Sequence, residues 1–199
     1  NPDLTPEDAC NKELGFDVST KFIHFSVTGY TLNISDMILW QQMENGNWIP
    51  NNIKQVWSRG MEAKTKFKIK ELSIRGNYAF TKSTNELPTN KLDNAVGEQL
   101  RYVPLHKGNI SFTLTKDNLQ HSLNISYTGE VITNHYHLNN NNVLDGFALI
   151  DFSIKYTFEK LPIIFVGKVK NLMDKSYTTY QNYPNPGREL LLTINYTIN

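Results

Sequence analysis

Residues Leu119–Val131 read LQHSLNISYTGEV, and they alternate between apolar and polar side chains along their whole length. Every odd position is apolar or small except His121, and every even position is polar. A repeat of two residues is the pattern of a β-strand, because successive side chains of a strand point to opposite sides of the sheet. This stretch therefore predicts a strand with one apolar face and one polar face.

The same alternation recurs along the rest of the chain, and helical periodicity is nearly absent. The segment 163–169 is apolar on both faces, and the segment that begins at Ile23 changes phase near Gly29. We expect an all-β, antiparallel fold with about nine strands. The segments that accompany Leu119–Val131 are 14–18, 23–39, 61–69, 72–80, 110–114, 150–158, 163–169 and 190–198.

The connections between these segments alternate between short and long. Short turns are expected near 20–21, 70–71, 115–118 and 159–162, and long polar loops at 41–52, 83–99, 133–145 and 171–187. This alternation is typical of outer-membrane barrels, in which the backbone groups of each strand must bond within the protein. The row Glu62, Lys64, Lys66 and Lys68 on one face fits a lumen filled by water or by a plug. Periodicity alone fits a soluble β-sandwich with one wet face about as well.

The composition excludes several classes of function. Twenty basic against 19 acidic residues give a net charge of +1, without the basic excess typical of nucleic-acid binding. Cys10 is the single cysteine, so neither an internal disulfide nor a zinc site built on several cysteines can form. No apolar run reaches the length of a transmembrane helix, and no phosphate-binding loop or nucleophile motif is present. We expect no enzyme activity, no cofactor, no metal centre and no nucleic-acid partner.

Three regions of the chain, the C-terminal one in two parts, favour a barrel over a sandwich. The C-terminal stretches Val169–Tyr177 (VKNLMDKSY) and Tyr183–Leu190 (YPNPGREL), followed by a closing strand, resemble the end of TonB-dependent receptors. The opening NPDLTPE at Asn1–Glu7 and the stretch LRYVPLHK at Leu100–Lys107 resemble other segments of that family. Two positions depart from the pattern, since Met173 and Ile198 stand where the family usually has aromatic residues.

The resemblance implies a transmembrane β-barrel of about 22 strands that encloses a plug. Residues 1–199 would be the C-terminal portion of this barrel, supplying about its last nine strands, with the plug and the early strands preceding Asn1. The implied function is active transport of an iron-siderophore, haem or cobalamin across the cell outer membrane. The implied partners are the TonB-ExbB-ExbD complex acting through the plug, the transported ligand, outer-membrane lipid and the barrel-assembly machinery. The alternatives are a passive porin and a soluble β-sandwich binding module or adhesin.

Two groups of side chains in the predicted long loops are candidates for ligand contact. Histidine is the commonest metal ligand, so His135, Tyr136 and His137 are candidates for a haem or metal chelate, with a solvated loop as the alternative. Trp48, Tyr180 and Tyr183 are candidates for the wall of a ligand vestibule. Aromatic residues also form girdles at membrane interfaces. We favour the girdle role for Trp57, Tyr156, Phe158 and Tyr196.

Overall fold

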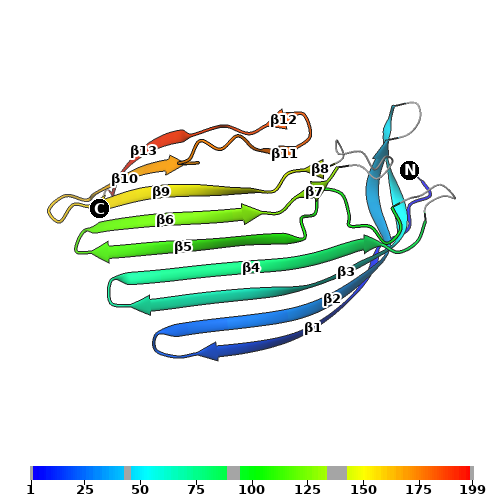
Figure 1. Ribbon diagram of the computed structural model, residues 1–199, viewed down its shortest axis with the longest axis horizontal. Helices are drawn as coiled ribbons and strands as arrows, with labels where there is room; N and C mark the ends of the chain where they lie inside the picture. The colour runs from blue at the N-terminus through cyan, green and yellow to red at the C-terminus, as the bar shows by residue number, and fades with distance from the viewer. Residues whose placement is uncertain (1, 43–45, 89–94, 134–142, 198–199) are drawn as a thin grey trace.

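A computed structural model describes residues 2–42, 46–88, 95–133 and 143–197. Its main feature is one nine-stranded antiparallel sheet, with neighbouring strands following one another along the chain (Figure 1). The strands are β1 (Asp8–Ser19), β2 (Ile23–Gln42), β3 (Trp48–Ile69), β4 (Leu72–Asn85), β5 (His106–Lys116), β6 (Leu119–Thr128), β9 (Phe147–Thr157), β10 (Ile163–Lys170) and β13 (Glu189–Tyr196). Two short pairs lie in the connections: β7 (Val131–Ile132) with β8 (Val143–Leu144), and β11 (Thr178–Tyr180) with β12 (Tyr183–Pro184).

The nine strands predicted from alternation are confirmed, and so is their antiparallel order. The sandwich alternative is wrong, because the nine strands form a single layer rather than two packed sheets. Within the described residues, Val56 is the sole hydrophobic side chain that is buried, and large apolar side chains are exposed on most strands of the sheet. The sheet therefore has no interior of its own, and its apolar face must be covered by something other than this chain.

No helix in the part of the chain that the structure describes is both long and apolar enough to cross a membrane.

Tight turns join the strands at one end of the sheet. The β3–β4 and β5–β6 connections are two residues long, and Lys70 and Asp117 within them adopt the left-handed conformation, with φ of 47° and 50°. Two-residue hairpin loops require such positive φ angles, because their twist matches the twist of the flanking strands. In Figure 1 these turns lie on the left, and the long connections lie on the right.

The predicted long loop at 41–52 is wrong in extent. Strands β2 and β3 remain paired as far as Gln42 and Trp48, so most of this segment is a hairpin that extends beyond the other strands (Figure 1). The N-terminal segment braces this extension: the backbone N–H of Ile38 donates to the Glu7 carboxylate at 2.6 Å. The side chain of Asn52 accepts from Thr5 N–H at 3.0 Å and donates to Thr5 C=O at 3.1 Å.

The strand register gives the sheet two unlike faces. One row of paired residues crosses eight strands and is apolar at every position: Ile23, Phe67, Ile74, Phe112, Leu123, Phe152, Val169 and Leu190. The adjacent row, one residue along each strand, is polar from β1 to β9: Ser19, His24, Lys66, Arg75, Ser111, Asn124 and Asp151. Because successive side chains point to opposite sides, the two rows lie on opposite faces, here termed the apolar face and the polar face.

The aromatic residues predicted to form girdles lie towards the two ends of the strands. Trp57 lies in the half of β3 nearer the long connections, whereas Tyr156 and Tyr196 lie beside the short turns, paired with Leu119 and Ile163. Tyr156 also packs edge-on against Phe158, with ring centroids 4.9 Å apart. This placement is the one expected of aromatic girdles.

The phase change near Gly29 has a structural counterpart. Strand β2 continues without a register shift, so Tyr30 turns to the polar face, where its hydroxyl hydrogen-bonds with that of Thr81 on β4 at 3.0 Å. The Tyr30 ring reaches Thr81 by passing over Gly60 on the intervening strand β3. A Cβ atom at position 60 would lie 2.7 Å from the Tyr30 hydroxyl and would also collide with the backbone oxygen of Phe80. Glycine at this position thus allows the aromatic ring to cover the strand.

We expect Gly60→Val to lower the free energy of unfolding of the receptor that contains this chain by about 1–3 kcal/mol, since overpacking forces the backbone to move. Urea titration of the lipid-reconstituted protein, followed by tryptophan fluorescence, measures this change. Gly29→Ala is the matched control, because a Cβ atom there would have its nearest neighbour at 4.0 Å. Equal unfolding midpoints for the two variants would contradict the assignment.

Candidate functional site

The polar face is hollowed near the short turns. A cavity of 610 Å³ lies over β3, β4, β5 and β6, and each of its lining residues belongs to the polar face or to the β3–β4 turn. The lining residues are Lys66, Lys68, Lys70, Glu71, Ser73, Arg75, Thr113, Thr115 and Gln120. The hollow therefore lies on the polar face, and this end of that face carries a basic surface.

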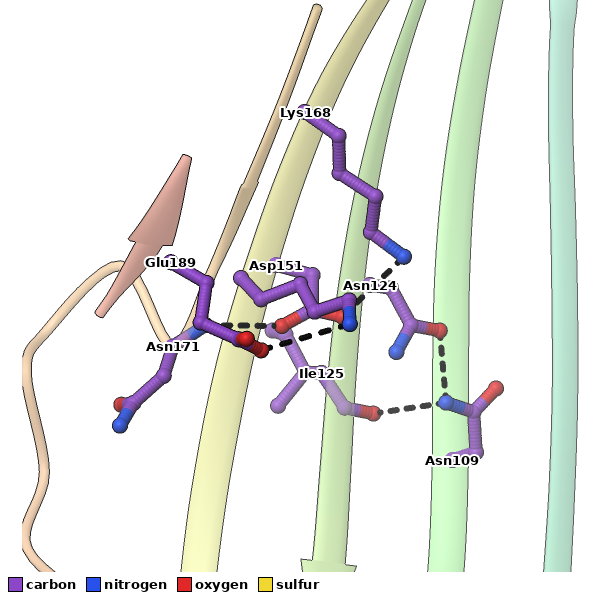
Figure 2. A network of polar contacts seen from close by, with 8 residues as sticks. Asn109, Asn124, Ile125, Asp151, Lys168, Asn171 and Glu189 are labelled. Carbon is purple, nitrogen blue, oxygen red and sulfur yellow. Dashed lines mark hydrogen bonds and ion pairs between the residues drawn. The ribbon is translucent and has the colours of Figure 1, made fainter. Parts of the chain in front are cut away.

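Further along the polar face, a set of ion pairs and hydrogen bonds crosses five strands (Figure 2). The Asp151 carboxylate on β9 lies 3.6 Å from the Lys168 ammonium on β10 and accepts a hydrogen bond from the backbone N–H of Asn171 at 3.0 Å. Lys170 and Glu189 pair at 3.3 Å between β10 and β13. Each pair places opposite charges side by side on adjacent strands. Such a surface suits a wall that faces water or another polar surface.

On the other side of Asp151, two amides continue the polar row. The Asn109 side chain on β5 donates to the Asn124 side-chain oxygen on β6 at 2.6 Å, and to the backbone oxygen of Ile125 at 3.4 Å. Asn124 is the register partner of Asp151 on β9. Polar side chains therefore run continuously over the strands from β5 to β13, as Figure 2 shows.

The segment NLMDK at 171–175 directly follows β10 and forms a turn next to this polar row. Asn171 is 4% exposed and has a φ of 48°. Its side chain accepts from the backbone N–H of Lys175 and donates to the backbone oxygen of Lys175, both at 2.9 Å. A little further on, the Asp174 carboxylate accepts from the backbone N–H of Arg188 at 2.8 Å, and a Cβ at Gly187 would lie 2.7 Å from it. The family-like motifs at 171–175 and 186–188 therefore act together to direct the chain into the last strand.

Tyrosine rings collect where the long connections meet. Tyr180 on β11 stacks on Tyr102 with centroids 4.7 Å apart and planes 10° from parallel, and Tyr183 on β12 lies edge-on at 5.7 Å. Tyr102 follows β4 in the chain, and its backbone N–H donates to Ile132 of β7 at 2.9 Å. Two connections distant in the sequence thus contribute rings to one aromatic cluster, defined here as Tyr102, Tyr180 and Tyr183, and a third connection holds the backbone of Tyr102.

The predicted site residues divide into three groups in the structure. Tyr180 and Tyr183 lie together, and Tyr183 is 68% exposed. Trp48 lies at the start of β3, on the extended hairpin opposite Gln42, and is 52% exposed. His135, Tyr136 and His137 fall outside the described residues. The sequence did not single out Tyr102, because the stretch Leu100–Lys107 indicated only the approach to a strand. The place of Tyr102 in the cluster depends on how the connections pack against each other.

The cluster and the polar face offer binding chemistry. Stacked tyrosines present flat rings with hydroxyl groups at their edges, a surface that suits planar or aromatic ligands. Among the residues described, no group of three or more His, Cys, Asp or Glu side chains is placed to hold a metal ion.

We expect Asn171→Ala to lower the free energy of unfolding by about 1–3 kcal/mol, because two backbone groups lose their partner and alanine disfavours a positive φ. Asn171→Gly retains the φ but not the hydrogen bonds, and so separates the two effects. Lys175→Ala is the matched control, because only its backbone makes these bonds. Chymotrypsin cleavage at Tyr177 in the folded receptor reports loosening of the turn. Equal cleavage of all three variants would contradict this role.

Comparison with known proteins identifies the sheet. Residues 1–172 match the family model described as TonB dependent receptor-like, beta-barrel. The chain is 26% identical over 202 residues to the vitamin B12 transporter BtuB of Photobacterium profundum, a match that covers 98% of this chain and 31% of that protein. The chain thus spans about a third of the length of this curated relative.

Solved structures show the same architecture. The ferric-catecholate import receptor Fiu from E. coli K12 superposes with a TM-score of 0.75 at 19% identity, over 98% of this chain and 28% of that one. A mutant of the ferric enterobactin receptor PfeA from Pseudomonas aeruginosa gives 0.76 at 17% identity, over 98% and 31%. At these identities the likeness concerns the fold. Together with the family match over residues 1–172, it establishes that the chain belongs to the TonB-dependent receptor family, whose members are outer-membrane β-barrel proteins, and forms part of the barrel wall.

Proposed function

We propose that the protein containing this chain imports a scarce nutrient across the cell outer membrane by TonB-dependent active transport. The family match over residues 1–172 carries this proposal. The two-faced sheet supports it physically: an uncovered apolar face suits hydrocarbon, and a polar face suits a lumen. A passive porin would use the same kind of wall, but the family match favours the receptor.

In this proposal residues 1–199 are the C-terminal portion of the barrel, and the rest of the polypeptide supplies the plug and the other strands. The plug and extracellular loops bind the ligand, and TonB, energised with ExbB and ExbD, pulls on the plug from the periplasm. The barrel-assembly machinery inserts the strands, and outer-membrane lipid covers the apolar face. The short turns then face the periplasm and the long connections face outwards, as in other barrels of this kind.

The aromatic cluster is the proposed ligand contact within this chain. The cluster lies among the long connections, and its rings are at least partly open. Trp48 on the extended hairpin is a further candidate, as are His135, Tyr136 and His137, which lie outside the described residues. The curated relative is named as a vitamin B12 transporter, and the two structural neighbours are named as a ferric-catecholate import receptor and a ferric enterobactin receptor. Cobalamin and iron chelates are therefore the ligand classes to test first.

Radiolabelled uptake into cells expressing the full receptor tests the function. We expect accumulation of a cobalamin, a ferric catecholate or haem that stops when the proton-motive force is dissipated or when TonB is absent, because transport requires energy. A porin would instead admit solute independently of both. Equal uptake with and without TonB would contradict the receptor proposal.

We expect Tyr102→Ala and Tyr180→Ala, separately, to weaken binding of the ligand found in the uptake experiment by roughly tenfold, as loss of a stacked aromatic contact does. Titration of the purified full receptor, followed by quenching of tryptophan fluorescence, measures the affinity. Tyr156→Ala is the matched control, because Tyr156 lies on the apolar face beside the short turns. If the control weakened binding as much as Tyr180→Ala, the cluster would not be the contact.

A further inference from the structure

Phe147 places an aromatic ring on the polar face of the sheet. It is the first residue of β9, and it shares its face with Asp151 because an even number of positions separates the two residues. Its row of paired residues continues through Thr128 on β6 and Lys107 on β5. A large apolar side chain beside such polar neighbours needs a partner that the strands of the sheet do not supply.

The partner is Tyr177, in the connection between β10 and β13. The two ring centroids lie 4.6 Å apart, with their planes inclined at 41°. Both residues are half-buried, whereas most of the connection is exposed. Within the stretch 172–188, the residues that are not exposed are Tyr177, Thr178 and Asn185. Past the turn at 171–175, the connection is therefore held to the main sheet at its base, where Tyr177 meets Phe147.

The hairpin of β11 and β12 extends from this base and carries two tyrosines of the aromatic cluster. Its strands form two residue pairs with an irregularity between them: Thr178 with Pro184, and Tyr180 with Tyr183. An isolated two-stranded hairpin is marginally stable in water, so a hairpin this short needs contacts outside itself to hold one orientation. The backbone N–H of Asn185 donates to the Tyr177 C=O at 3.1 Å, which closes the hairpin directly on the anchored residue.

The backbone that carries Phe147 is itself closely packed. A Cβ atom at Gly146 would lie 3.1 Å from the backbone oxygen of Thr128. The neighbouring Gly129 donates its N–H to the backbone oxygen of His106 on β5 at 2.8 Å. The start of β9 is thus fixed against two other strands, and it gives rigid support to the ring that packs on it.

We infer that Phe147 and Tyr177 are positioning residues for the aromatic cluster. Their ring contact fixes the β11–β12 hairpin, and the hairpin holds Tyr180 on Tyr102 before a ligand binds. A site that is ordered in advance does not spend binding free energy on ordering its loops. This inference rests on the proposed function in taking the cluster as the ligand contact, whereas the placement of the hairpin can be tested without any ligand.

Double electron–electron resonance on the full receptor, purified without ligand, tests the placement. One spin label is attached through Q181C, between β11 and β12 at the tip of the hairpin. The other is attached through K160C, in the short turn after β9. The background carries C10S, and any other cysteine of the receptor is replaced in the same way. The width of the distance distribution then reports how firmly the hairpin is held relative to the sheet.

The test variants remove one ring or the other. Y177A and F147A abolish the contact, whereas Y177F keeps the ring and F147L keeps part of the apolar bulk. The matched control is Y127A, because Tyr127 pairs with Ala148, the residue next to Phe147, but its ring lies on the apolar face. Heat-modifiable migration on gels verifies that each variant is folded, and F147L replaces Y177A and F147A if those two do not fold.

We expect narrow distance distributions for the labelled receptor without further substitution, for Y177F and for Y127A. In Y177A and F147A the distribution broadens about twofold, because the hairpin is only marginally stable without its anchor. F147L gives an intermediate width, because its side chain still packs against part of the Tyr177 ring.

Uptake of vitamin B12 and of ferric enterobactin by cells that express the same variants, without labels, reports the consequence for a ligand. We expect Y177A to raise the concentration for half-maximal TonB-dependent uptake about tenfold, as for a cluster that is correctly placed about a tenth of the time. The maximal rate stays unchanged, because the plug and TonB are untouched. Y177F and Y127A leave both quantities as they are.

Several results would overturn the inference: a narrow distribution in Y177A, a broad one in the receptor with both rings, or equal broadening in Y127A. A lower maximal rate at an unchanged half-maximal concentration would also overturn it, because the hairpin would then act on transport and not on binding. If the widths change as expected but neither ligand shows TonB-dependent uptake, the transport proposal fails for these ligands and the positioning role stands.

Discussion

A shift of one residue in the pairing of any two neighbouring strands would turn every side chain of one strand to the opposite face. In this chain the register runs without such a shift from β1 to β13. Apolar rows therefore continue from strand to strand, and polar rows do the same on the other face. The separation of faces, the concave basic hollow and the outward aromatic rings all follow from this constraint. It also accounts for the lack of a conventional core among the described residues, since the apolar side chains collect on one face of a single layer and stay exposed.

Several special residues serve to maintain the register where the chain would otherwise depart from it. The apolar pattern of β2 shifts by one residue near Gly29, while the strand register stays constant, so Tyr30 lies on the polar face. Gly60 leaves room for the Tyr30 ring there. Asn171 and Asp174 adopt positive φ angles and bind backbone groups, so that the chain reaches β13 in the correct register. At Gly60 the missing side chain avoids a clash with Tyr30 and the Phe80 backbone. At Asn171 and Asp174 the side chains bind backbone N–H groups of the turn.

The polar face and the long connections divide the work of the proposed receptor. The polar face holds paired charges such as Asp151 with Lys168, and it offers a wall to water or to a plug. The connections carry aromatic rings from separate parts of the chain and bring them together as the cluster around Tyr180.

The sequence by itself determined the number of strands, their two faces and the alternation of short and long connections, because a period of two follows directly from backbone geometry. The motifs at 171–175 and 183–190 also indicate the family by themselves, because each is a continuous stretch of the chain. Only the tertiary structure decided that the segment 41–52 is mostly a paired hairpin, that Tyr102 joins Tyr180, and that Tyr30 reaches Thr81 over Gly60. These features depend on which residues become neighbours once the strands pair and the loops pack. Contacts between residues that are distant in the chain leave no local sequence pattern from which they could be predicted.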